Sequence, residues 1–305
     1  MSPARKGLAL HRNRTYAGVL LAACGLVGAH GCASVLGIEA DRHLVAANDG
    51  GSSGPADAGP WSCLGTPPKL GDPSAKVAVT VLLFDGVSNE TSAGSVDGGS
   101  DLVAVDYTPL TGAQIRYCGI RDPNCSSPSP AVTTDDAGLA TFQVAGDFAG
   151  FFDVQRSDLV PASFYPGNLV ADQAAQTFPT YDFTPANLSL LASTVTSSKI
   201  ALDTDGGLGH IFVTIYDCND HQAAGVSLTI DNSAAQTVVF YSSGGLPTTK
   251  TSQTDNYGLA GAVNVPIGAL TVKATLAAQL LPIGTINVPI RPGAITFAYI
   301  RVKTL

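Results

Sequence analysis

One seven-residue pattern occurs twice in this chain and constrains its fold more than any other feature. Thr134 to Ala140 reads Thr-Asp-Asp-Ala-Gly-Leu-Ala, and Thr254 to Ala260 reads Thr-Asp-Asn-Tyr-Gly-Leu-Ala. In such a turn an Asp side chain accepts backbone N–H groups and the Gly supplies a positive φ. The pattern predicts two copies of one module, with these structural turn residues: Thr134, Asp135 and Gly138, and Thr254, Asp255 and Gly258.

Short β-rich segments surround both turns. Residues 77–84 and 211–216 are rich in β-branched residues and predict the opening strand of each copy, and residues 139–144 and 259–265 predict the strand after each turn. Many short strands separated by turn signals are typical of an antiparallel β-sandwich. The fold class predicted is therefore all-β, with two tandem transthyretin-like or Ig-like antiparallel sandwiches after a signal peptide and a disordered linker.

The order of features resembles that of the carboxypeptidase regulatory-like domain, a transthyretin-like β-sandwich. That family has a strand, a Pro-Leu-x-Gly-type segment, a Thr-Asp-x-x-Gly turn and a Gly-containing corner in this order. The residues that carry the resemblance are Pro109, Leu110, Gly112, Thr134, Asp135, Gly138 and Gly150 in the first copy, and Gly225, Thr254, Asp255, Gly258, Pro266, Gly268 and Val272 in the second. The resemblance covers about two thirds of the chain and implies an accessory domain without the metallocarboxypeptidase activity.

The N-terminus has the features of a bacterial export signal. Four basic residues among the first fourteen precede an apolar run, residues 16–31, which is too short for a confident membrane span. Cys32 is favoured as the lipidation point and Cys24 is the alternative; residues 31–39 also resemble the mature start of predicted myxobacterial lipoproteins. A diacylated cysteine would anchor the chain durably, and no Asp follows either cysteine to favour inner-membrane retention.

The mature chain is divided by its composition. Residues 48–60 have no apolar side chain larger than Pro and predict a flexible tether. Residues 184–191 predict a capped helical turn, with Thr184 at the N-cap and Pro185 at the first helical position. The predicted domains are a signal peptide (1–31), a linker (32–60), the first sandwich (61–160), a connector (161–205) and the second sandwich (206–305).

The charge balance limits the partners. The 16 basic residues include four in the leader, whereas none of the 24 acidic residues precedes Glu39. Removing the leader therefore gives the chain a net charge of 12 − 24 = −12. Such a surface repels phosphate backbones, which argues against a nucleic-acid partner. Attachment to a membrane should therefore occur through the N-terminal lipid.

Four cysteines remain beyond the lipidation candidates. An even set in an exported chain favours disulfides over metal ligands. Cys118 and Cys125 flank a turn signal, so the first choice among three connectivities is Cys118–Cys125 with Cys63–Cys218. The irregular spacing, and the lack of a His near Cys63, Cys118 or Cys125 in sequence, argue against a zinc site.

No sequence motif supports catalysis. Residues 97–101 and 203–207 resemble the start of calcium loops but lack the downstream Glu, so plain turns are favoured, although a looser loop site stays open. No catalytic residue, metal or cofactor is predicted. Convergence of Asp153, Arg156, His210 and His221 in one pocket would revive an enzyme hypothesis.

The aromatic residues permit two interpretations. Residues 164–183 and the pair Phe240-Tyr241 could form an exposed stacking surface for a sugar or a partner, or they could fill the cores and the seam between modules, which is favoured. The predicted function is a non-catalytic, lipid-anchored envelope or surface protein, in the outer membrane and facing either side, with a structural, adhesive or partner-binding role. A carbohydrate-binding accessory module is the alternative, and a hydrolase of unknown type is less favoured.

Overall fold

The computed structural model describes most of the chain after residue 58. The described residues are 59–65, 71–86, 108–167, 169, 173–196, 202–203, 206–244 and 246–302. The predicted signal peptide, Cys24, Cys32 and the linker up to residue 58 lie outside them, so these predictions stay predictions.

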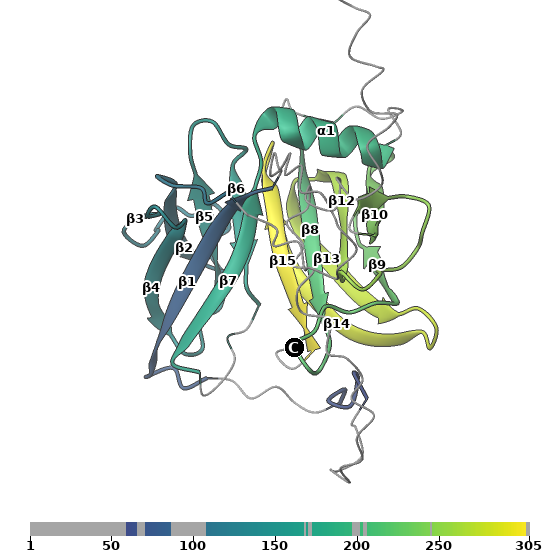
Figure 1. The fold of residues 1–305 in the computed structure, drawn as a ribbon, viewed down its shortest axis with the longest axis horizontal. Helices are drawn as coiled ribbons and strands as arrows, with labels where there is room; N and C mark the ends of the chain where they lie inside the picture. The colour runs from purple at the N-terminus through teal and green to yellow at the C-terminus, as the bar shows by residue number, and fades with distance from the viewer. Residues whose placement is uncertain are drawn as a thin grey trace, which may run out of the picture. The chain divides into compact units, whose positions relative to one another are not determined.

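Seven strands of the first repeat form a β-sandwich. They are β1 (Lys76–Asp85), β2 (Gln114–Gly119), β3 (Val132–Thr133), β4 (Leu139–Ala145), β5 (Gly150–Gln155), β6 (Ala162–Tyr165) and β7 (Ala175–Asp182). One sheet has the order β4-β1-β7, and it packs against the strands β6-β5-β2-β3 (Figure 1). Side chains of β1 alternate between fully buried and more exposed positions, as expected for a strand with one face on a core.

The second repeat has the same pairing pattern. Its strands are β8 (Leu208–Tyr216), β9 (Val226–Ile230), β10 (Val238–Ser243), β11 (Leu246–Thr248), β12 (Leu259–Pro266), β13 (Gly268–Leu276), β14 (Leu281–Ile290) and β15 (Ile295–Arg301). Strand β8 lies between β12 and β15 as β1 lies between β4 and β7, and β13 lies between β9 and β14 as β5 lies between β2 and β6. The repeated turn therefore marks a repeat of the whole strand topology, and the predicted all-β sandwich fold is confirmed.

The two repeats share one sheet. Strand β15 of the second repeat pairs in parallel with β6 of the first, from Ile295 opposite Ala162 to Ala298 opposite Tyr165. This pairing produces a nine-stranded sheet of order β11-β10-β12-β8-β15-β6-β5-β2-β3. The sheets are not purely antiparallel as predicted, because β1–β7, β8–β15 and β6–β15 are parallel pairs.

Opposite faces of the shared sheet enter two different cores. On β15, Phe297 and Tyr299 belong to the core of the first sandwich, whereas Ala298 and Ile300 belong to that of the second. On β5 the neighbouring Phe151 and Phe152 divide in the same way. Because successive side chains of a strand point to opposite faces, each core extends across the junction between the repeats.

The segment predicted as a connector is more structured than expected. It contains β6 and β7, which complete both sheets of the first sandwich, so the strands of that repeat extend beyond residue 160. It also contains α1 (Pro185–Thr196), which begins as predicted: Thr184 accepts a hydrogen bond at Oγ1 from the Asn187 amide at 3.2 Å. Helix α1 lies beside β10 (Figure 1) and β11. Its Leu191 is buried in the first core.

Candidate functional site

The Thr-Asp-x-x-Gly turn of the first repeat is held by its own backbone and side chains. Thr134 Oγ1 donates to the Leu110 carbonyl at 2.7 Å and accepts from the Ala113 amide at 3.0 Å. Asp135 Oδ1 accepts from the amides of residues 137 and 139, both at 2.9 Å. Gly138 has φ +74°, and its carbonyl accepts from the amide of Leu83, at the end of β1.

The second turn repeats most of these bonds. Thr254 Oγ1 donates to the Ala223 carbonyl at 2.7 Å and accepts from the Val226 amide at 3.0 Å. Asp255 Oδ1 accepts from the Tyr257 amide at 3.0 Å and from Ser242 Oγ at 2.5 Å. The carboxylates of both turns therefore bind backbone groups that close the turn, the role that the sequence predicts for them.

The structure contains both disulfides of the favoured connectivity. The Cys118–Cys125 disulfide closes the loop that follows β2. The Cys63–Cys218 disulfide joins the segment before the first sandwich to Cys218, which lies just after β8. The Cys218 amide also donates to the Pro60 carbonyl at 2.8 Å. The second disulfide therefore fixes the start of the described chain to the second repeat.

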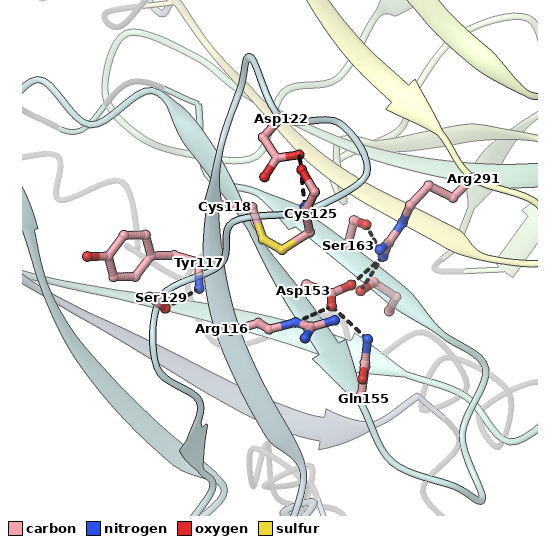
Figure 2. A network of polar contacts seen from close by, with 12 residues as sticks. Arg116, Tyr117, Cys118, Asp122, Cys125, Ser129, Asp153, Gln155, Ser163 and Arg291 are labelled. Carbon is pink, nitrogen blue, oxygen red and sulfur yellow. Dashed lines mark hydrogen bonds and ion pairs between the residues drawn. A yellow bond between two sulfur atoms is a disulfide. The ribbon is translucent and has the colours of Figure 1, made fainter.

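A buried carboxylate joins the two repeats, and no sequence motif indicated it. Asp153, on β5, is completely buried, and it ion-pairs with Arg116 at 2.9 Å and with Arg291 at 2.6 Å (Figure 2). Gln155 Nε2 donates to the same carboxylate at 2.8 Å. Arg291 follows β14 of the second repeat, so this contact links residues far apart in sequence.

Arg291 makes further contacts on the first repeat. Its Nη2 donates to Ser163 Oγ at 2.5 Å and to the Ala162 carbonyl at 3.2 Å, both on β6. The guanidinium also lies 5.9 Å from the centroid of the Phe151 ring. The Asp153 carboxylate is therefore held by one guanidinium group from each repeat. The arrangement is that of an inter-repeat clamp.

His210 forms a second buried polar contact. It is 1% exposed, and its Nδ1 accepts a hydrogen bond from the Asn264 amide at 3.3 Å. Asn264 lies where the β8–β12 register shifts, has φ +57°, and accepts from the Asp203 amide at 2.9 Å through Oδ1. Burial lowers the pKa of His210 to about 4, so this imidazole is neutral at neutral pH.

The four residues that would revive an enzyme hypothesis have separate partners. Asp153 and His210 bind the groups described above, whereas Arg156 pairs with the exposed Asp158 at 2.7 Å and the half-exposed His221 lies 4.0 Å from Asp217. Within the described part of the chain, no group of three or more His, Cys, Asp and Glu side chains could hold a metal ion. Residues 97–101 lie outside that part, as do residues 204 and 205 of the other calcium-like segment.

The aromatic residues mostly fill the cores and the seam. Phe164, Phe178, Phe183 and Phe240 are at most 1% exposed, and Tyr241 is 7% exposed. A cavity of about 50 Å³ does lie among aromatic side chains between β7 and the shared sheet. It is much smaller than an engineered apolar cavity of roughly 150 Å³ that binds benzene, so it has no room for a sugar ring.

The Arg301 guanidinium lies over the aromatic rings of Tyr216, Phe178 and Tyr299. Its central carbon lies 4.9 Å from the Tyr216 ring centroid, 5.3 Å from that of Phe178 and 5.6 Å from that of Tyr299. The Tyr299 hydroxyl donates to the Pro179 carbonyl, and burial raises its pKa. Arg301 and these rings therefore bind the last strand to β7 and β8.

No family model matches this chain, so its resemblance to the carboxypeptidase regulatory-like domain stays a prediction. No curated protein matches either. Among solved structures, the Bacillus anthracis TIE protein matches 74% of this chain at 16% identity and a TM-score of 0.23, but only 34% of its own chain is covered. The shaft pilin SpaA of Lactobacillus rhamnosus GG matches 74% of this chain and 98% of its own at 10% identity and a TM-score of 0.24.

A minor pilin of Streptococcus agalactiae matches 74% of this chain and 94% of its own, with 13% identity and a TM-score of 0.22. Likenesses this weak support no inference about function. Among the described residues, no helix is long and apolar enough to span a membrane.

Proposed function

We propose that this chain is a non-catalytic protein of the bacterial cell envelope, anchored by a lipid on Cys32 or Cys24, with a structural, adhesive or partner-binding role. In this proposal the two sandwiches act together as one stiff body at the end of a tether. The outer membrane is the proposed location.

One observation carries the proposal: the two repeats are joined through a continuous sheet. A parallel strand pair, two cores that extend across the junction and the Asp153–Arg291 ion pair all connect them. Independent modules joined by a plain linker would leave their edge strands free to move apart. A stiff body suits a spacer or scaffold because it holds a binding surface at a fixed distance and orientation from its anchor.

The described polar groups support the non-catalytic part of the proposal. The aspartates of the turns bind backbone amides, Asp153 is held by two arginines, and His210 is buried and neutral. These contacts stabilise the fold, and none of these groups is paired with another as an acid and a base. Two disulfides suit an exported chain, since they persist in oxidising compartments.

The carbohydrate-binding alternative receives less support. Sugars stack on exposed aromatic faces, but the aromatic residues that the sequence singled out are mostly buried. Protein partners are therefore favoured over glycans.

Intact mass spectrometry of the protein extracted from its native membrane tests the anchor. We expect a chain that begins at Cys32 or Cys24, carries a diacylglyceryl group, and gains two hydrogen atoms per disulfide after reduction. A chain without lipid would contradict the proposed anchorage, and replacement of the modified cysteine by Ser should release the protein from the membrane.

A further inference from the structure

A groove runs along the free edge of β14. Two adjoining hollows, of about 180 and 640 Å³, share three lining residues: Ile120, Asn287 and Val288. The smaller is lined by all of residues 285–288, and the larger by all of residues 287–292. Because successive side chains of a strand point to opposite faces, a groove lined by consecutive residues follows the strand edge.

Among the described strands, β14 has a hydrogen-bonded neighbour on one side only. It lies at the end of the sheet β14-β13-β9 and pairs with β13 along its length. Pro282 and Pro289 lie near its two ends, where they remove backbone donors. Between them, residues 283–288 form a six-residue edge that can pair with an added strand.

The opposite wall of the groove comes from the first repeat and is preorganised. It includes Ile120, Pro123 and Asn124 of the loop that the Cys118–Cys125 disulfide closes. The Asp122 side chain braces this loop further by accepting from the Ser126 and Ser127 amides. Ile120 is 40% exposed, and Ile267, at the far end of the groove, is 53% exposed. These side chains offer apolar contacts to a chain lying in the groove.

Tyr165 supplies a hydroxyl that has no hydrogen-bond partner in the described part of the chain. It is 5% exposed, lines the smaller hollow, and its buried hydroxyl contacts no hydrogen-bonding group among the described residues. Burial raises its pKa, so the hydroxyl keeps its proton. A buried unpaired hydroxyl is costly, and a peptide carbonyl in the groove would satisfy it.

The groove is nearly free of charge on an acidic chain. Among its lining residues only Arg291 carries a charge, and that charge is already paired with Asp153. We propose that this groove binds an extended, uncharged segment of another polypeptide, which adds a strand to β14. The proposal rests on the partner-binding role above, and it gives that role a location.

A capped hexapeptide of alternating Val and Thr, added to the full-length protein, is the probe. Strand addition forms backbone hydrogen bonds with the β14 edge and places alternate side chains against the groove. We expect slowed amide hydrogen exchange at alternate residues of 283–288 when the peptide is present. A peptide N-methylated at every residue has no N–H to donate to the edge from either side, so it should give no protection.

Three substitutions separate binding from folding. Ile120→Asp places a charge in the groove wall and should weaken binding about tenfold or more, whereas Leu280→Asp, at an 80% exposed site outside the groove lining, should not. Tyr165→Phe removes a hydroxyl that has no described partner, so it should weaken binding severalfold while leaving the unfolding midpoint unchanged or higher.

No protection at millimolar peptide, or equal protection by the N-methylated peptide, would overturn the proposal. If these amides are protected without peptide, and the protection increases with protein concentration, the groove binds a second copy of this chain. That result would overturn the choice of partner. These results do not depend on whether mass spectrometry finds a lipid on the chain. A groove that binds no peptide can therefore be distinguished from a chain that carries no anchor.

Discussion

The structure predicts that substitution of two glycines with the same backbone conformation lowers the free energy of unfolding by different amounts. Gly258 has φ +59° and Gly225 has φ +77°, so Ala at either site adopts a left-handed conformation. A Cβ on Gly258 would lie 2.6 Å from the Ile215 carbonyl oxygen and 2.8 Å from the Ala223 nitrogen, whereas a Cβ on Gly225 meets nothing within 4 Å. The pair therefore separates backbone strain from steric clash.

The magnitudes follow from these two terms. The left-handed conformation costs a non-glycine residue about 1–2 kcal/mol, and both variants share this cost. The clash at Gly258 involves backbone atoms, which cannot rotate away, and overpacking of this kind costs about 1–3 kcal/mol more. We expect Gly258→Ala to lower the free energy of unfolding by about 2–5 kcal/mol and Gly225→Ala by about 1–2 kcal/mol. Gly258→Val should be worse still, since a β-branched side chain tolerates positive φ poorly.

Urea unfolding measures the difference. Trp61, the only tryptophan of the chain, packs against the second core, so its fluorescence reports on this repeat. Far-UV circular dichroism should give the same midpoint if the joined repeats unfold together. Equal midpoints for the two Ala variants, or an unchanged midpoint for Gly258→Val, would refute the role assigned to this turn.

Three further predictions concern buried groups. His210 has a pKa of about 4 when folded and an ordinary value of 6.5, so the unfolded chain binds more protons between these values. The free energy of unfolding should fall by about 3 kcal/mol as the pH drops from 6.5 to 4. His210→Asn should flatten this pH dependence in urea titrations. An equally steep fall in the variant would show that His210 is not the group responsible. Asp153→Asn leaves two arginines without their counter-charge and should lower the free energy of unfolding by about 2–3 kcal/mol, allowing for the partial exposure of the arginines. Asp158→Asn, at an exposed ion pair, should leave the thermal midpoint unchanged. Equal thermal midpoints for the two variants would contradict the inter-repeat clamp. Replacing Cys63 and Cys218 together by Ser should cost about 2–4 kcal/mol in denaturant titration, and an unchanged midpoint would mean that this disulfide constrains nothing.

Local sequence signals predicted the parts of the fold that local chemistry determines. The repeated turn needs a Gly at positive φ and a short acceptor side chain, so Asp135 and Gly138 are recognisable without a structure. The N-cap of α1 depends on Thr184 and Pro185, which are adjacent in sequence. The Cys118–Cys125 pairing follows from the turn between the two cysteines.

The junction between the repeats could not be predicted in the same way. Strand β15 is buried along both faces, a pattern that also fits a strand in the middle of one sandwich, so the sequence does not reveal that β6 is its neighbour. Asp153 and Arg291 carry no motif, because their pairing depends on how the two repeats dock. The groove along β14 is likewise made by a strand of one repeat and a loop of the other.

Native-state hydrogen exchange at the junction tests most directly whether the two sandwiches form one body. The amides of Ile295 to Ala298, where β15 pairs with β6 and β8, should exchange as slowly as those in the core of β8, because they open only when the whole unit unfolds. Fast exchange along the β6–β15 pairing, with β1 and β8 still protected, would show two independent modules and contradict this expectation.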